Sequence, residues 1–131
     1  MLLNHLSLVV ADPQISADFY ATIAGAPSFR VWLGHSLHLR TDEGLDLAFQ
    51  RGTPQRLPGA HHGFLAPTTG AVDRLLADLR LRGVKITDDC QEAGFRSVKF
   101  LDPDGYEVEV YWEADWPAPG GAVGRPDSGA G

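Results

Sequence analysis

Apolar and polar residues follow the same order of patterns twice along this chain. Residues 3–10 alternate with a period of two, which predicts a strand, and the apolar residues after them recur at helical spacing. Three shorter strand patterns come next, and the order of one strand, one helix and three strands begins again at residue 61. Two glycines and two prolines within residues 51–59 indicate a connection between two halves, residues 1–57 and 60–113. The pattern predicts an α+β fold of two βαβββ modules.

Each half contains one predicted helix with a single apolar stripe. Asp12 can cap the first helix, and Pro13 suits its first position. The residues expected to be buried on the two helices are Ile15, Phe19, Tyr20 and Ile23 on the first, and Val72, Leu75, Leu76 and Leu79 on the second. The strands are expected at residues 3–10, 28–33, 36–40, 45–50, 61–66, 84–87, 95–101 and 106–112. Two such modules can pair their sheets into a cupped, partly open mixed β-sheet barrel with the helices outside.

The composition is that of an ordinary globular protein. The chain has 131 residues, of which 44% are hydrophobic and 21% are charged, so we expect one domain over residues 1–113. Glycine and proline become frequent after Glu113, and residues 114–131 are therefore expected to form a disordered tail. The proposed sheets leave open edges. Because such edges are usually covered, we expect a homodimer.

The net charge narrows the range of partners. A formal charge of −6 argues against nucleic acid or an anionic membrane surface as a partner. The single cysteine, Cys90, excludes an intrachain disulfide and is consistent with a reducing compartment. No apolar run is long enough to span a bilayer, and no signal peptide is visible at the N-terminus. We therefore expect a cytoplasmic protein whose partner is a small-molecule substrate.

Side chains that commonly bind metals fall on the strand faces that point away from the helices. His5 and Ser7 share this face of the first strand, and Glu109 lies on it in the last strand. His61 lies on the same side if Phe64 packs against the second helix. Two imidazoles and one carboxylate suit a divalent cation such as Fe²⁺, Mn²⁺, Zn²⁺, Ni²⁺ or Co²⁺, with positions left open for substrate. A solvated acidic face on an edge strand is the alternative interpretation.

Two segments of the chain resemble a known superfamily. The run Phe100-Leu101-Asp102-Pro103-Asp104-Gly105-Tyr106, with Glu109 four residues after the glycine, resembles the C-terminal signature of the vicinal oxygen chelate superfamily. This is the glyoxalase/bleomycin resistance/extradiol dioxygenase family, which also includes fosfomycin-resistance enzymes and methylmalonyl-CoA epimerase. Residues 3–12 resemble the first strand of fosfomycin-resistance enzymes and of many glyoxalase-like proteins. The resemblance covers residues 1–113 and implies the paired βαβββ fold.

The resemblance also implies a divalent metal site. His5 stands where these proteins have their first metal-binding histidine, and Glu109 stands at their metal-binding glutamate. His61, with Phe64 three residues and Pro67 six residues later, matches the second histidine, in the strand that leads into the second helix. His62 is the rival for this position, because a slip of one residue in a strand reverses the two faces. The implied ligands are therefore His5, His61 and Glu109.

Further residues are candidates for the chemistry around such a metal. Asp46 and Glu109 are the candidate catalytic carboxylates, since glyoxalase I and methylmalonyl-CoA epimerase have a glutamate at about the position of Asp46. Asp46 could be a fourth ligand, a general base acting through water, or a solvated carboxylate, and the sequence leaves these three open. Ser7 and Tyr111 are expected to line the substrate pocket. His38 is expected at the surface.

These observations predict a metal-dependent enzyme that binds its substrate through two neighbouring oxygen atoms. The reaction could be that of a lyase or isomerase, a thiol transferase or a dioxygenase, and the sequence does not distinguish these. A thiol transfer to a phosphonate lacks a matching basic cluster, because Arg96 and Lys99 face opposite ways. The alternative is a non-catalytic dimer that binds an antibiotic or metabolite, as bleomycin-resistance proteins do.

Overall fold

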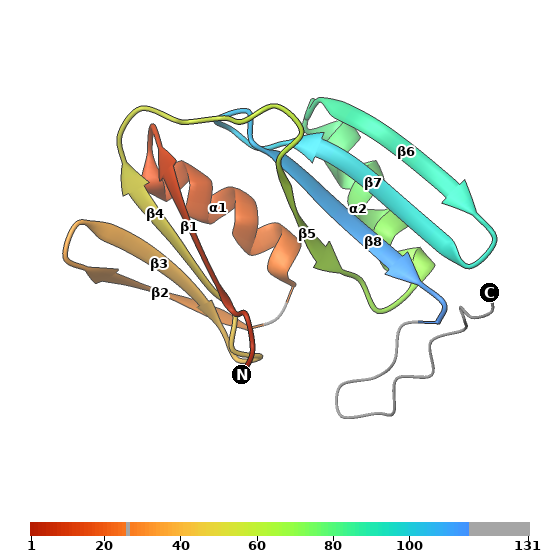
Figure 1. Cartoon of the computed structure of the whole chain (residues 1–131), viewed down its shortest axis with the longest axis horizontal. Coiled ribbons are helices and arrows are strands. Elements are labelled where there is room, and N and C mark those ends of the chain that lie inside the picture. The colour runs from red at the N-terminus through yellow and green to blue at the C-terminus, as the bar shows by residue number, and fades with distance from the viewer. Residues whose placement is uncertain (26, 116–131) are drawn as a thin grey trace.

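The structure, a computed structural model, describes residues 1–25 and 27–115 and contains two modules with the same order of elements (Figure 1). The first module comprises β1 (His5–Val10), α1 (Pro13–Ala24), β2 (Ser28–Leu33), β3 (Ser36–Thr41) and β4 (Asp46–Arg51). The second comprises β5 (His61–Leu65), α2 (Thr69–Leu81), β6 (Ile86–Glu92), β7 (Phe95–Leu101) and β8 (Glu107–Glu113). The predicted α+β fold with two βαβββ modules is confirmed. Most of the tail predicted at residues 114–131 lies outside the described residues.

Each module forms its own four-stranded mixed sheet. The strand order is β1-β4-β3-β2 in the first sheet and β5-β8-β7-β6 in the second. In both sheets the first strand runs parallel to the last, and the other pairs are antiparallel. Within the described ranges no strand of one sheet pairs with a strand of the other, so the sheets of a single chain do not close into one barrel. Strands β1, β2, β5 and β6 are therefore sheet edges.

Helix α1 begins as the sequence predicts and packs Phe19, Tyr20 and Ile23 against the core, whereas Ile15 departs from the prediction. The Asp12 carboxylate accepts a hydrogen bond from the amide of Gln14, and proline occupies the first turn. Ile15, which was expected to be buried, is 53% exposed, whereas Ser16 and Ala17 are fully buried. The reason is that α1 contacts both modules, and small residues on one side let it approach its neighbours closely. Figure 1 shows α1 at the centre of the molecule, between the two sheets.

The two modules share one hydrophobic core, built on their helix-facing sides. Tyr20 on α1 stacks on Phe49 of β4 and contacts Phe64 of β5. Phe19 on α1 also reaches Phe100 of β7, with ring centroids 6.1 Å apart. The buried cluster therefore continues from one module to the other. As a consequence, the opposite face of each sheet lies outside this core.

The Asp-Pro-Asp-Gly turn after β7 fastens the second module to the first. Asp102 is 5% exposed and accepts hydrogen bonds from the Tyr20 hydroxyl and from the amides of Asp104 and Tyr106. The Asp104 carboxylate accepts from the amide of Ala11 and the hydroxyl of Ser16. The turn thus holds the start of α1 against the end of β7, and its acidic residues are used for structure.

Among the described residues, no helix is long and apolar enough to cross a membrane.

Candidate metal site

Two groups of polar side chains lie on the sheet faces opposite the helices. The first, which we call the Asp46 cluster, comprises His5 of β1, His38 and Arg40 of β3 and Asp46 of β4. The second, the Glu109 cluster, comprises His61 of β5, Ser97 of β7 and Glu109 of β8. The predicted ligands are thus divided between two sheets. His61 and Glu109 come together, and His5 lies in the other cluster.

Strand register explains the Glu109 cluster. Gly63 pairs with Glu109 in the parallel β5–β8 ladder, so His61, two residues earlier, lies diagonally beside Glu109 on the same face. The His61 Nε2 atom lies 3.2 Å from Glu109 Oε1, and the Ser97 hydroxyl donates to Oε2. A side chain at Gly63 would contact both Glu109 and the ring of Tyr111, so this glycine leaves the space beside the carboxylate open.

The His61–Glu109 pair fits two neighbouring positions around one divalent cation. Metal–nitrogen and metal–oxygen bonds of roughly 2.0–2.2 Å place two adjacent ligand atoms about 3.0–3.5 Å apart in octahedral or tetrahedral geometry. The observed 3.2 Å between His61 Nε2 and Glu109 Oε1 lies in this range. Over residues 1–25 and 27–115 there is no group of three His, Cys, Asp or Glu side chains arranged to hold a metal ion.

The Asp46 cluster is built around the central strand β4. His5 is the direct partner of Asp46 in the parallel β1–β4 ladder, and Arg40 is its partner in the antiparallel β3–β4 ladder. His38 Nδ1 lies 2.8 Å from Asp46 Oδ1, and His5 Nδ1 lies 3.2 Å from Oδ2. The two imidazole rings are nearly parallel, at an interplanar angle of 17°.

His38 is the residue of this cluster that sequence reasoning missed. Its side chain is 12% exposed and hydrogen-bonded, so the prediction that it lies at the surface is wrong. Burial raises the pKa of the Asp46 carboxyl, but hydrogen bonds from His38 and Arg40 outweigh this effect and hold that pKa below its usual value. Asp46 is consequently a carboxylate at neutral pH, and its side chain is only 19% exposed.

His62 occupies a different environment from His61. Its ring lies on the helix side of β5, where Nε2 is 2.9 Å from the Tyr20 hydroxyl. That hydroxyl donates its one proton to Asp102 at 2.7 Å, so His62 must donate to the hydroxyl oxygen. Burial, with a smaller contribution from the charge of His61, lowers the pKa of His62. The structure therefore brings His61, and not His62, to Glu109.

The two residues predicted for the substrate pocket lie on the same faces as the clusters. Ser7 on β1 is exposed and pairs with Ala48. Tyr111 on β8 packs beside Phe95, with ring centroids 6.3 Å apart. Burial and the nearby carboxylates of Glu113 and Glu109 raise the pKa of Tyr111, so its hydroxyl remains protonated over the ordinary pH range.

The two basic residues of β7, Arg96 and Lys99, point to opposite faces of the sheet. Lys99 pairs with Glu109 across the β7–β8 ladder and shares its face. Arg96 is 5% exposed and pairs with Asp73 of α2 and Asp89 of β6. The guanidinium of Arg96 is thus paired with two carboxylates on the helix side, and Lys99 alone of the two can reach a ligand beside Glu109.

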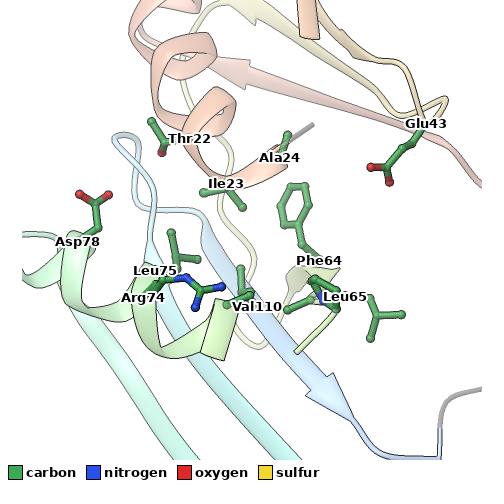
Figure 2. Close-up of a pocket in the computed structure, with 14 residues that line it drawn as sticks. Thr22, Ile23, Ala24, Glu43, Phe64, Leu65, Arg74, Leu75, Asp78 and Val110 are labelled. Atoms are coloured by element: carbon green, nitrogen blue, oxygen red, sulfur yellow. The ribbon is translucent and has the colours of Figure 1, made fainter. Parts of the chain in front are cut away.

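A separate cleft of about 820 Å³ lies between the end of α1 and the start of α2 (Figure 2). Phe64 and Val110 form part of its floor, and Arg74 and Glu43 lie at its rim. Phe64 and Val110 point to the helix side of their sheet, whereas Glu109 points to the other. None of the predicted site residues lines this cleft, so its chemistry is separate from that of the two clusters.

Comparison with known proteins identifies the family. Residues 2–110 match the Glyoxalase/Bleomycin resistance protein/Dioxygenase superfamily. The chain belongs to this superfamily. The glutathione transferase FosA of Serratia marcescens is 30% identical over 122 residues, which cover 83% of this chain and 79% of that protein.

Solved structures of other proteins share the fold. The fosfomycin resistance protein FosX from Listeria monocytogenes is 20% identical, covers 86% of this chain and 93% of its own, and has a TM-score of 0.72. The oxidase ChaP-H1 is 24% identical, covers 92% of this chain and 99% of its own, and has a TM-score of 0.71. At these identities the structural matches establish the arrangement of the modules and leave the reaction open.

Proposed function

We propose that this superfamily member is a metal-dependent enzyme acting on a small molecule with two neighbouring oxygen atoms. The observation that carries the proposal is the His61–Glu109 pair, whose facing nitrogen and oxygen are spaced as two ligands of one cation. The relatives named as a glutathione transferase and as an oxidase support catalysis over simple binding. His61 and Glu109 would hold the metal, with His5 as the third ligand.

We propose that His5 comes from a second copy of the chain. Within one chain the helix-facing core and the Asp102 turn hold the modules together, so turning the face of His5 onto that of Glu109 would break this core. Strands β1 and β5 both have a free edge. On the His5 side of the first sheet, Phe29 is 54% exposed and Leu33 is 46% exposed, and a second copy would cover such apolar side chains. A homodimer would then bear two equivalent sites.

The chain's own residues would orient the substrate around that metal. A bound divalent cation would polarise the two substrate oxygens and stabilise negative charge on them. Ser97 holds one oxygen of Glu109 and leaves Oε1 directed at His61. Tyr111 keeps its proton and can donate to a substrate oxygen, while the Phe95 ring beside it offers an apolar wall.

The basic residues near the proposed site bear on the choice of reaction. Lys99 pairs with Glu109 on its face, whereas the Arg96 guanidinium is engaged on the helix side. Arg40 lies in the Asp46 cluster with His5 and would enter a shared site together with it. Lys99, Arg40 and the bound cation could all meet an anionic substrate, so thiol transfer, lyase or isomerase chemistry and dioxygenation all remain candidate reactions.

Metal content tests the proposal. Elemental analysis of the purified protein should show one divalent metal per chain, and His5→Ala, His61→Ala and Glu109→Gln should each lower it well below that value. His35→Ala is the matched control, because His35 is exposed in the β2–β3 turn, and it should keep the wild-type content. Added Mn²⁺, Fe²⁺, Ni²⁺, Co²⁺ or Zn²⁺ should raise the melting temperature of metal-free protein.

A wild-type protein that neither carries metal nor is stabilised by it would overturn the enzymatic proposal. A dimer that binds an antibiotic or metabolite without metal would then be the better account, and binding that persists in the presence of a chelator would identify it.

A further inference from the structure

We infer that the cleft between the end of α1 and the start of α2 is a second ligand site, which binds a small amphiphile with its one carboxylate at Arg74 and its apolar body over Phe64. The cleft volume of about 820 Å³ lies within the roughly 300–1,000 Å³ typical of small-molecule sites. None of the proposed metal ligands lines this cleft, so the inference goes beyond the proposed function and does not depend on it.

Apolar side chains from three elements form the body of the cleft. Ile23 at the end of α1 and Leu75 on α2 lie on its sides, and Phe64 of β5 lies on its floor (Figure 2). All three side chains pack against the hydrophobic core but are only partly buried. Because their remaining exposed surfaces line the same cleft, one apolar ligand would remove them from water together.

Two of the four polar residues that line the cleft are already engaged within the chain. The Thr22 hydroxyl donates to the Phe19 carbonyl at 2.7 Å and accepts from the Arg82 guanidinium at 3.2 Å. The Asp78 carboxylate pairs with the same guanidinium at 2.7 Å. Arg74 and Glu43 are the other two, and within residues 1–25 and 27–115 neither takes part in an ion pair. These two residues therefore set the charge that the cleft offers to a ligand.

Arg74 supplies the cation of the site. Figure 2 shows its guanidinium directed over the cleft, near Val110. Gly70, one turn earlier on α2, leaves room for this arrangement, because a Cβ there would lie 3.2 Å from Arg74 Nη1. A guanidinium can bind both oxygens of a carboxylate through two parallel hydrogen bonds, which favours a carboxylate as the polar group of the ligand.

Glu43 limits the ligand to one carboxylate. It lies across the Phe64 ring from Arg74 in Figure 2, in the turn that joins β3 and β4. A second anionic group at that end would be repelled by the Glu43 carboxylate, whereas the end of an apolar chain would not. The ligand class that fits is thus a monocarboxylate, such as a medium-chain or aryl-substituted alkanoate.

Isoleucine methyl groups allow this site to be observed in solution. The chain has three isoleucines, Ile15, Ile23 and Ile86, and of these only Ile23 lines the cleft. The full chain is labelled with ¹³C at its isoleucine δ1 methyls and titrated with decanoate below the micelle concentration. We expect decanoate to shift the Ile23 signal saturably and to leave the other two in place. Decyltrimethylammonium, a cation with the same alkyl chain, should bind at least about tenfold more weakly.

Replacing Arg74 tests the polar half of the site. Arg74→Gln should raise the dissociation constant for decanoate by about tenfold or more, as expected for hydrogen bonds between charged groups. Arg80→Gln is the matched control, because Arg80 lies on the same helix but pairs with Asp89 outside the cleft, and it should change that constant by less than about twofold. An Ile23 signal that decanoate does not move, equal binding of decyltrimethylammonium, or unchanged binding in Arg74→Gln would each overturn the inference.

The same spectra distinguish two other occupants of the cleft. An Ile23 signal that shifts when the ligand-free protein is diluted would assign the cleft to a second copy of the chain. One that shifts when the chain is ended after Asp115 would assign it to residues 116–131, and either result would overturn the inference. The Ile23 shift with decanoate should persist in the presence of a metal chelator, so a failure of the proposed metal site would leave this result unchanged.

Discussion

Replacing Tyr20 with phenylalanine removes one hydroxyl from the contact between the two modules. That hydroxyl donates to the buried Asp102 carboxylate at 2.7 Å and accepts from His62 at 2.9 Å. Tyr20 itself is fully buried, so water cannot replace the lost partner without opening the core. Tyr20→Phe should therefore destabilise the protein more than the loss of an ordinary surface hydrogen bond.

The structure allows a rough magnitude for this loss. A hydrogen bond to a charged group contributes about 1.5–3 kcal/mol, and a buried donor left without a partner costs about 1–3 kcal/mol. Asp102 keeps its bonds from the amides of Asp104 and Tyr106, and the phenyl ring retains the apolar contacts of Tyr20. We expect Tyr20→Phe to lower the free energy of unfolding by about 3 kcal/mol.

Urea unfolding followed by circular dichroism measures this free energy. The slope of the free energy with urea should stay at its wild-type value, because the shared core still couples the modules. Tyr111→Phe is the control, since the part of the chain that the structure describes offers its hydroxyl no hydrogen bond, and it should change stability by less than about 0.5 kcal/mol. A loss below about 1 kcal/mol for Tyr20→Phe would refute the role assigned to this network.

Two further predictions concern stability. Because burial lowers the pKa of His62, the unfolded chain takes up a proton as the pH falls through about 6.5 while the folded chain does not, so the free energy of unfolding should fall between pH 7.5 and 5.5. His62→Gln should make that pH dependence shallower in thermal melts. Gly105 has φ of 86° and an added Cβ would lie 2.5 Å from the Arg56 guanidinium, so Gly105→Ala should lower stability by about 1–2 kcal/mol. Equal stability of the Gly105→Ala variant in urea would contradict this account of the turn.

Periodicity and cap chemistry were enough to predict the order of elements. The strands at residues 28–33 and 95–101 have the predicted bounds, and the first helix begins after Asp12, whose side chain accepts the expected cap hydrogen bond. The face of His61 was also predictable, because Phe64 three residues later had to pack on the helix. These features depend on residues that are close in the sequence, so they can be predicted from the sequence alone.

Two elements departed from prediction for physical reasons. Strand β6 extends to Glu92, well beyond the predicted residues 84–87, because polar residues such as Asp88 and Gln91 suit an edge strand without giving an alternating pattern. Ile15 was assigned to the buried stripe of α1, yet this helix buries Ser16 and Ala17 against its neighbours. The apolar pattern of a single helix does not show that two sheets pack against it.

The strand faces of the candidate residues were predictable, but not how these residues group. His5, His61 and Glu109 lie on the faces predicted for them, whereas the partnership of Asp46 with His38 depends on the register between β3 and β4. A turn between two strands can have several lengths, so the sequence did not fix that register. The division of the ligands between two open sheets likewise depends on how the modules pack.

Mixing two variants that each bind metal poorly tests most directly whether the metal site is shared between two copies. His5→Ala and Glu109→Gln each leave every site of their own homodimer defective. In a mixed dimer, however, one site would combine the intact His5 of one chain with the intact His61 and Glu109 of the other. If the subunits exchange randomly, half of the dimers are mixed and the preparation should regain about a quarter of the wild-type metal content. No recovery after denaturing and refolding the two variants together, under conditions in which the wild type refolds and rebinds metal, would contradict a site shared between two copies.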